Sequence, residues 1–199
     1  MIRLPSERRP QSEVLNASRW KIEADGWLSA AHSCISPNYD ERPPHVYPRI
    51  LVVHAISLPP DHFGGRDIDA LFTNTLNPAA HPYYENISHL NVSAHFLIRR
   101  DGELMQFVST AHRAWHAGVS SWNGIEKCND FSIGVELEGC DTLPFEKLQY
   151  PILVQLTRAL WRHYPFEEIV GHEHIAPGRK TDPGPYFDWD YYRKLLALD

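Results

Sequence analysis

The chain has 199 residues, of which 43% are hydrophobic and 12% aromatic, so it can bury the hydrophobic core of a single domain. Its net charge of −6 argues against nucleic-acid binding, because phosphate contacts require clustered lysine and arginine side chains. Cys34, Cys128 and Cys140 are an odd number without CxxC spacing, which predicts free thiols and argues against a disulfide framework or a thiolate zinc site.

Residues 1–20 are polar and lack hydrophobic periodicity, which predicts a mobile leader or a partly docked arm before one domain at residues 21–199. No apolar run in this leader is long enough for a secretory signal. No stretch of the chain reaches the roughly 20 apolar residues of a membrane span. We therefore expect a cytoplasmic protein with no membrane partner.

An early edge strand is predicted at Trp27 to Ala31, and the first central strand at residues 49–56. The second run is β-branched throughout its middle, which is typical of a strand buried on both faces. Near its end stands His54. A lone histidine in such a strand is more often a satisfied core residue than a ligand, so only its partners can assign it a function.

A turn-rich loop follows, and then a short helix predicted at residues 68–76, which ends before Asn77-Pro78. Loops that leave the end of a central strand are favoured places for substrate contacts. Tyr83, within the aromatic segment at residues 81–84, is a candidate substrate contact. Packing in a satellite core is the alternative for this segment.

Two strand-like runs at residues 93–100 and 103–108 flank Asp101-Gly102, a pair that predicts a β-hairpin. The next loop carries Trp115 and His116. Trp115 is suited to stack on a sugar or a peptide, and a place in the core is the alternative.

Residues 130–139 alternate in character, which predicts another strand of the sheet. One face would carry Phe131, Ile133, Val135 and Leu137. The opposite face would carry Ser132, Gly134, Glu136 and Glu138. Two carboxylates would then project from the same side of the sheet.

The last third of the chain continues this alternation of elements. We predict a helix at residues 151–164, a short strand at residues 167–171 that ends at His172, and an amphipathic helix from Asp188 to Leu198. Strands that alternate with helices and a hairpin predict an α/β domain with a mixed central β-sheet flanked by helices.

Residues 171–185 read Gly-His-Glu-His-Ile-Ala-Pro-Gly-Arg-Lys-Thr-Asp-Pro-Gly-Pro, which is too rich in proline and glycine for a helix or a strand. A catalytic zinc site needs three protein ligands and an open position for water. His54, His172 and Asp182 meet this requirement, because a loop of this length can fold back toward the end of a neighbouring strand. Zinc bound there would activate water and polarise the carbonyl of an amide.

Amide hydrolysis also needs a proton carrier and a group that stabilises the oxyanion. Glu136 is our candidate proton carrier, and Lys180 is our candidate oxyanion partner. An ordinary ion pair between these two residues is the alternative, and Glu138 is the rival carboxylate, expected nearer to solvent. We expect His95 and His116 to support the ligands, contact substrate or lie in the core. The other candidates lie in turn-rich or polar segments, where a surface position is expected, and no spacing alone distinguishes them from His54: His45, His62, His81 and His112.

Several motifs resemble the AmpD-type N-acetylmuramoyl-L-alanine amidases, which are zinc enzymes. They lie in order at residues 26–27, 51–54, 56–60, 63–65, 92–95, 113–118, 128–134, 136–139 and 171–185. The resemblance implies the fold of that family, a mixed sheet flanked by helices as in peptidoglycan-recognition proteins. It also implies that the zinc ligands are His54, His172 and Asp182, that Glu136 is the catalytic carboxylate and that Lys180 is the catalytic cation.

The implied reaction is cleavage of the lactyl-amide bond between 1,6-anhydro-N-acetylmuramic acid and the L-Ala of the stem peptide. In the family this step belongs to cytoplasmic peptidoglycan recycling and lowers the muropeptides that induce β-lactamase. We expect anhydro-muropeptides to contact Trp115, His116, Arg179 and Tyr83, and we expect no obligate protein partner. The alternatives are an amidase that acts on intact cell wall and a muropeptide-binding module without catalysis, although such modules commonly lack one zinc ligand.

The chain departs from the family pattern at four positions. Ala55 stands where asparagine is usual, Asn91 and Lys127 stand where arginine is frequent, and His174 replaces an aspartate. The first three positions are expected to touch the substrate. His174 lies two residues from a predicted ligand, where a second imidazole could alter the ligand's surroundings or capture a stray metal.

Overall fold

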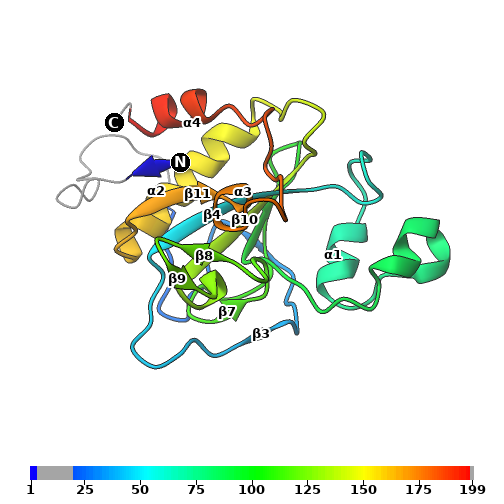
Figure 1. Ribbon diagram of the computed structural model, residues 1–199, viewed down its shortest axis with the longest axis horizontal. Helices are drawn as coiled ribbons and strands as arrows, with labels where there is room; N and C mark the ends of the chain where they lie inside the picture. The colour runs from blue at the N-terminus through cyan, green and yellow to red at the C-terminus, as the bar shows by residue number, and fades with distance from the viewer. Residues whose placement is uncertain (4–19, 198–199) are drawn as a thin grey trace.

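The structure is a computed structural model that describes residues 1–3 and 20–197. Its centre is a mixed β-sheet with the strand order β1-β11-β4-β10-β5-β6-β2 (Figure 1). These strands are β1 (Ile2–Arg3), β2 (His32–Ser33), β4 (Ile50–Ile56), β5 (Phe96–Ile98), β6 (Leu104–Gln106), β10 (Ser132–Glu138) and β11 (Glu168–Gly171). The remaining strands form two small ribbons, β3 (Tyr39–Asp40) with β7 (Arg113–Ala114) and β8 (Ser121–Trp122) with β9 (Ile125–Glu126).

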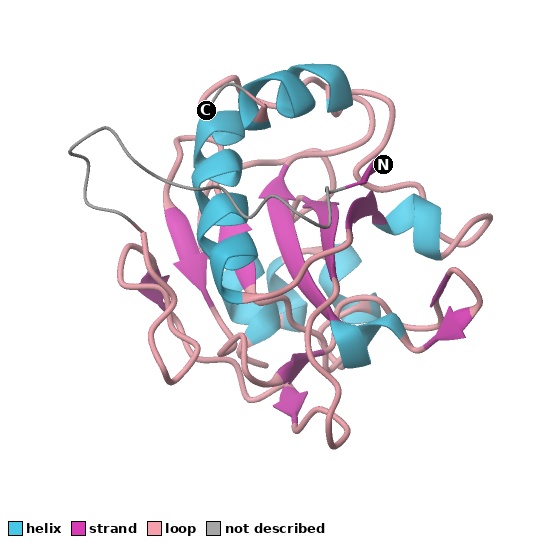
Figure 2. Cartoon of the chain, turned by 90° about the vertical axis from the view of Figure 1, so that its left-hand side faces the viewer, coloured by secondary structure: helices cyan, strands magenta, loops and turns pink. Residues whose placement is uncertain are grey.

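Helices and short 3₁₀ turns surround the sheet. The helices are α1 (Asp67–Phe72), α2 (Gln149–His163), α3 (His172–Ile175) and α4 (Trp189–Leu196). The 3₁₀ turns are η1 (Pro78–Ala80), η2 (Pro82–Asn86) and η3 (Cys128–Phe131). Figure 2 shows α2 lying across one face of the sheet. The predicted α/β domain with a mixed central sheet is therefore confirmed.

The two faces of the central strands differ: one packs against α2, and the other carries Glu136. Strands β11, β4, β10 and β5 run parallel, with β4 and β10 at the centre. On one face of β10, the side chains of Ile133, Val135 and Leu137 are fully buried in the hydrophobic cluster that includes Leu153 of α2. Because side chains alternate along a strand, Glu136 projects to the other face. The predicted alternation of β10 thus directs its carboxylate away from α2.

The β5–β6 hairpin forms at the predicted place, with shorter strands than the sequence pattern suggests. The N–H of Gly102 donates to the carbonyl of Arg99 at 3.0 Å, and Gly102 adopts a φ of 88°. This left-handed conformation favours glycine, which has no Cβ. The glycine of the Asp-Gly pair therefore closes the turn.

The predicted early edge strand is wrong in place, and the predicted first helix is wrong in extent. Residues 27–31 form no strand, because Leu28 makes only an isolated bridge to Ile22 and its N–H donates to the Gln106 side chain at 2.7 Å. The edge strand is β2, at His32–Ser33. Helix α1 ends at Phe72 and not at residue 76, because Asn74 takes a positive φ of 59° that stops the helix.

The predicted helices near the C-terminus are present with shifted ends. Helix α2 begins two residues before the predicted start, because the side chain of Gln149 accepts a hydrogen bond from the N–H of Glu146 and closes the preceding turn. Helix α4 begins after Asp188, whose carboxylate caps it by accepting from the N–H of Tyr191 at 2.8 Å. Leu198, the predicted last residue of this helix, lies outside the described residues.

The start of the chain lies on the sheet, where β1 pairs antiparallel with β11. Residues 4–19, most of the predicted leader, are outside the described part, so the domain boundary near residue 20 stays a prediction. None of the helices in residues 1–3 and 20–197 has both the length and the apolar character that crossing a membrane requires.

The core under α2 gives a stability prediction. We expect Leu153→Ala to lower the free energy of unfolding by about 2–5 kcal/mol, because a fully buried leucine is replaced by a cavity. The matched control is Leu143→Ala, at a side chain with 45% exposure, for which we expect a change within about 0.5 kcal/mol. Denaturant unfolding followed by circular dichroism measures both, and equal losses would contradict the assignment of this core.

Candidate metal centre

Three parallel strands bring the candidate site together at their carboxyl ends. His54 lies near the end of β4, and its Cα partner on β10 is Glu136. On its other side β4 pairs with β11, and His172 follows β11 directly as the first residue of α3. The loop after α3 returns Asp182 to the same place. Parallel strands end at a common edge, and such edges are where ligands bind in α/β folds.

The ligand atoms of these three residues form a small triangle. His54 Nδ1 lies 3.0 Å from His172 Nδ1. Each of the two nitrogens lies 3.1 Å from Asp182 Oδ2. An ion with tetrahedral ligands at about 2.0–2.2 Å requires ligand separations of about 3.3–3.6 Å. A slight spreading of the three side chains would therefore accommodate such an ion.

The hydrogen bonds around His172 show which of its nitrogens is free for a metal. Its Nε2 lies 3.0 Å from the carbonyl oxygen of Ala117, which can only accept, so Nε2 carries the proton. A neutral imidazole then presents the lone pair of Nδ1 to His54 and Asp182. Metal-binding histidines are commonly held in this way, with the other ring nitrogen donating to a carbonyl. The residues present fit a bound metal.

Burial and charge favour the forms of these groups that bind metals. His54 is 1% exposed, and burial lowers its pKa to about 4, so the imidazole is neutral at neutral pH. Burial acts to raise the pKa of Asp182, but hydrogen bonds with His172 and His54 outweigh it and hold that pKa well below its usual range. Neutral imidazole and ionised carboxylate are the protonation states required of metal ligands.

Glu136 lies beside this cluster with an unsatisfied carboxyl oxygen. Its Oε2 is buried and has no hydrogen-bond partner in the described part of the chain. Burial raises the pKa of Glu136 well above its usual value, the charge of Asp182 raises it further, and the charge of Lys180 lowers it. A carboxyl group with a raised pKa is suited to accept and return a proton near neutral pH.

Lys180 is exposed, and the described residues contain no ion pair between Lys180 and Glu136 within 4.0 Å. The ordinary ion pair considered as an alternative is therefore absent from these residues. The charge of Lys180 is nevertheless close enough to lower the pKa of both Glu136 and His54. Lys180 thus lies within electrostatic range of the cluster.

Glu138, the rival carboxylate, has a different task. It was expected near solvent, but it is 2% exposed. Its Oε1 accepts from the N–H of Gly64 at 2.6 Å, and its Oε2 accepts from the N–H of Arg100 at 3.1 Å. The loop at residues 57–66 covers it. The alternation of β10 could not predict this burial, because alternation shows on which face of the sheet a side chain lies but not how exposed it is. Glu138 therefore joins this loop and the hairpin to the end of β10.

The residues predicted to contact substrate make hydrogen bonds within the protein. Trp115 donates from its indole Nε1 to Asp40 Oδ1 at 3.1 Å. Arg179 donates to the carbonyl oxygens of Ala117 at 2.6 Å and Val119 at 2.7 Å. The ring of His116 makes hydrogen bonds with His54 and Ser132. Substrate roles for Trp115, Arg179 and His116 stay predictions.

Tyr83 is not brought to the cluster. It is 40% exposed and lies on η2. Figure 1 shows this segment, in green, on the far side of α1 from α3. A substrate role for Tyr83 also stays a prediction.

His174, the departure nearest the ligands, does not join the cluster. Its Nδ1 accepts a hydrogen bond from the N–H of Gly171 at 2.8 Å, and its ring packs edge-on against Trp189 with a centroid distance of 5.7 Å. In the part of the chain that the structure describes, the three-ligand group contains only His54, His172 and Asp182. An aspartate could accept the same bond, so His174 preserves the local structure before α3.

Sequence reasoning gave His116 as a possible support of the ligands, which its contact with His54 bears out, but it missed the partners of His116. His54 Nε2 lies 2.9 Å from His116 Nδ1, and His116 Nε2 lies 3.0 Å from Ser132 Oγ. Asn129 Oδ1 accepts from the N–H groups of His116 at 3.2 Å and Ala117 at 2.8 Å. These residues lie in two motifs noted in the sequence, but no spacing in either motif indicates the contacts.

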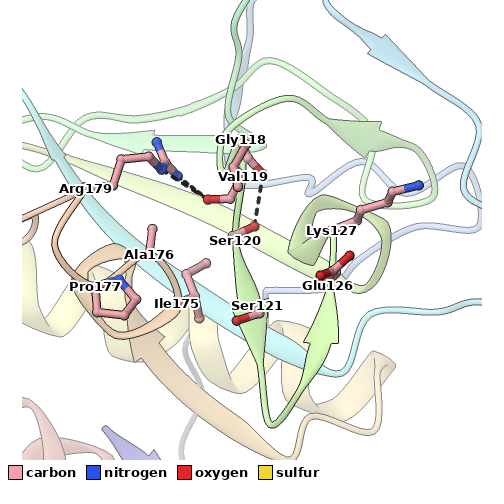
Figure 3. A pocket seen from close by; sticks show the side chains of 10 residues that line it. All are labelled: Gly118, Val119, Ser120, Ser121, Glu126, Lys127, Ile175, Ala176, Pro177 and Arg179. Carbon is pink, nitrogen blue, oxygen red and sulfur yellow. Dashed lines mark hydrogen bonds between the residues drawn. The ribbon is translucent and has the colours of Figure 1, made fainter.

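A cavity of about 560 Å³ has Arg179 in its lining, but none of the three ligand residues lines it. Its lining residues are Gly118, Val119, Ser120, Ser121, Glu126, Lys127, Ile175, Ala176, Pro177 and Arg179. Figure 3 shows Arg179 and Pro177 on one side of it and Glu126 and Lys127 on the other. Arg179 links the cavity to the cluster, because it shares the carbonyl of Ala117 with His172. The cavity is large enough for part of a small-molecule ligand.

Comparisons with known proteins agree on one family. The family model described as N-acetylmuramoyl-L-alanine amidase, Amidase_2, matches residues 43–185. The 1,6-anhydro-N-acetylmuramyl-L-alanine amidase AmpD of Escherichia coli K12 is 58% identical over 176 residues, which are 87% of this chain and 96% of that protein. A crystal structure of an AmpD derivative superimposes with a TM-score of 0.85 at 57% identity and covers 86% of this chain and 97% of its own.

A more distant structure contains a ligand. It is the complex of the N-acetylmuramyl-L-alanine amidase AmiD from E. coli with anhydro-N-acetylmuramic acid-L-Ala-D-gamma-Glu-L-Lys, described as its substrate. It is 26% identical, with a TM-score of 0.54, and the match covers 87% of this chain and 65% of that one.

The cluster gives a prediction for metal content. We expect Asp182→Ala to lose bound divalent metal, from about one ion per chain to near zero after dialysis, because it removes one of three ligands. Inductively coupled plasma mass spectrometry measures the content. Asp190→Ala is the matched control, because this exposed aspartate pairs only with Arg193 in the described residues and should leave the metal in place. A fully loaded Asp182→Ala variant would contradict the site.

Proposed function

This chain belongs to the N-acetylmuramoyl-L-alanine amidase family, and we propose that it hydrolyses the lactyl-amide bond between 1,6-anhydro-N-acetylmuramic acid and the L-Ala of a stem peptide. The observation that carries this proposal is the convergence of His54, His172 and Asp182 beside the unsatisfied carboxyl group of Glu136. This arrangement combines a site for a Lewis acid with a proton carrier, which are the two requirements of amide hydrolysis.

Zinc is the metal that we propose for the site. Two imidazoles and one carboxylate, without a thiolate, are the ligand set of many catalytic zinc sites. Zinc bound there supplies Lewis-acid activation of water and of the amide carbonyl at neutral pH. His54 and His172 hold their lone pairs toward this position, and Asp182 contributes the negative charge.

Glu136 is the proposed proton carrier. Its raised pKa brings the carboxyl group closer to the working pH, so it can take a proton from the attacking water and return it to the leaving nitrogen. Because its Oε2 has no hydrogen-bond partner in the described residues, the group is free to bind the water.

Lys180 is the proposed stabiliser of the negative charge that develops on the substrate carbonyl oxygen. Its ammonium group is exposed toward solvent but lies within electrostatic range of Glu136 and His54. A positive charge at this place favours the transition state more than the neutral amide. Lys180 therefore stabilises the negative charge on the carbonyl oxygen, and Glu136 transfers the proton.

Anhydro-muropeptides are the proposed substrate class. The relatives at high identity carry the 1,6-anhydro substrate in their name, and the AmiD complex holds an anhydro-muramic tripeptide. The cavity that Arg179 lines would receive part of such a ligand, with Lys127 and Arg179 as its cationic side chains. Cytoplasmic peptidoglycan recycling, with loss of the muropeptides that induce β-lactamase, is the proposed role.

The first test concerns Glu136. We expect Glu136→Gln to retain zinc but to lose turnover of anhydro-muropeptide by roughly 10²–10⁴-fold, because the amide cannot carry the proton. Release of the stem peptide, followed by liquid chromatography, measures the rate. Glu146→Gln is the control, because this carboxylate is 54% exposed and pairs with Arg100. A Glu136→Gln variant with the parent's rate would remove Glu136 from the mechanism.

The second test concerns the substrate. Mass spectrometry of products from anhydro-muropeptide, ordinary muropeptide and intact sacculi compares the three substrates with one enzyme preparation. We expect stem peptide and anhydro-N-acetylmuramic acid from the first, and little soluble product from sacculi. Efficient release from sacculi would favour the alternative amidase of the intact cell wall. Binding without any release would favour the muropeptide-binding module.

A further inference from the structure

We propose that the segment His116-Ala117 is a positioning device that holds both histidine ligands in their zinc-binding tautomers, with Asn129 and Gly134 fixing its place. The inference rests on the zinc-dependent function proposed above. It assigns a task to four residues that do not themselves reach the metal position. His116 contacts one ligand with its side chain, and Ala117 contacts the other with its carbonyl oxygen.

His116 serves His54. For His54 to offer its Nδ1 lone pair to zinc, the neutral ring must carry its proton on Nε2. That nitrogen lies 2.9 Å from His116 Nδ1, so His116 must accept there. A neutral His116 then carries its own proton on Nε2, which lies 3.0 Å from Ser132 Oγ, an atom that can accept. Metal binding at His54 therefore sets the direction of both hydrogen bonds in the series His54–His116–Ser132.

Ala117 serves His172 through the main chain. Its carbonyl oxygen lies 3.0 Å from His172 Nε2 and can only accept, whereas Nη2 of Arg179, which can only donate, lies farther away at 3.4 Å. The shorter contact favours the tautomer with the proton on Nε2. Arg179 donates to the same oxygen at 2.6 Å. The two ligands are thus held by adjacent residues, one through an imidazole and one through a peptide group.

Asn129 holds this segment against the start of β10. Its Oδ1 accepts from two consecutive N–H groups, those of His116 and Ala117. Because both acceptor contacts come from one atom, a shift of the segment by even a fraction of an ångström would lengthen at least one of them. Asn129 thereby couples the placement of the two ligand contacts.

Gly134 supplies the space that the ring of His116 occupies. A Cβ at residue 134 would lie 2.5 Å from Cγ and 2.6 Å from Nδ1 of His116. Glycine in the middle of a central strand normally weakens it, and it often marks the close approach of another group. Here the ring of His116 lies directly over the backbone of β10. An alanine at residue 134 would displace the ring without removing any polar atom.

The test compares variants that keep or remove the acceptor. We expect His116→Phe to weaken zinc binding by roughly 10–100-fold, because the ring volume remains while the acceptor for His54 is lost. His116→Gln retains an amide oxygen and should recover part of the loss. Competition with a chromophoric zinc chelator measures the dissociation constants, and thermal unfolding of the metal-free proteins shows whether each variant is folded.

Two variants in β10 give an independent arm that leaves His116 in place. We expect Gly134→Ala to weaken zinc binding at least as much as His116→Phe. Ile133→Val, a small change on the opposite face of the same strand, should lower the stability of the metal-free protein and leave the zinc dissociation constant unchanged. Weakening by Ile133→Val equal to that by Gly134→Ala would mean general damage to the strand and would overturn the proposal.

Zinc affinities within threefold of the parent for both His116→Phe and Gly134→Ala would also overturn it. These outcomes are separate from the fate of the proposed function. A parent protein that binds zinc but leaves anhydro-muropeptide uncleaved refutes the amidase mechanism while the comparison of affinities stands. An active parent whose affinity is insensitive to these variants refutes only the positioning role.

Discussion

The parallel pairing of β4 with both β10 and β11 is the constraint on which the site depends. Its register places Glu136 directly opposite His54 and ends β11 where His172 begins. A slip of one residue would turn the side chain of His54 to the face packed under α2, because side chains along a strand alternate. The apolar residues on that face, such as Val53 and Val135, therefore fix the register that the chemistry requires. Core packing on one side of the sheet positions the polar groups on the other.

Much of this arrangement could be predicted from the sequence. The β-branched run of β4 and the alternation of β10 are strong local signals, and they correctly predict strands that end beside polar groups. The short strands β2, β8 and β9 could not be found in this way, because two residues contain no periodicity. The contacts of His116 with His54 and Ser132 depend on close approach across the fold, which no spacing in the sequence encodes.

Buried polar groups separate into two kinds at this edge of the sheet. Glu138 has both carboxyl oxygens bonded to main-chain N–H groups and so stabilises the loop over the strand end. Glu136, two residues earlier on the same face, has an oxygen that is left unsatisfied within the described chain. Leaving a buried carboxyl oxygen unsatisfied is costly, which supports the proposed chemical role of Glu136. The contrast assigns the two acidic residues of one strand to different tasks.

The unequal exposure of the three ligands limits how an ion could come and go. The side chains of His54 and His172 are 2% and 3% exposed, whereas that of Asp182 is 18% exposed, so solvent reaches the cluster past the aspartate. A muropeptide lying over the cluster would cover the same opening. Metal retention in a chelating buffer would then rise with substrate concentration, and reloading of the stripped protein would be slowest while the opening is occupied.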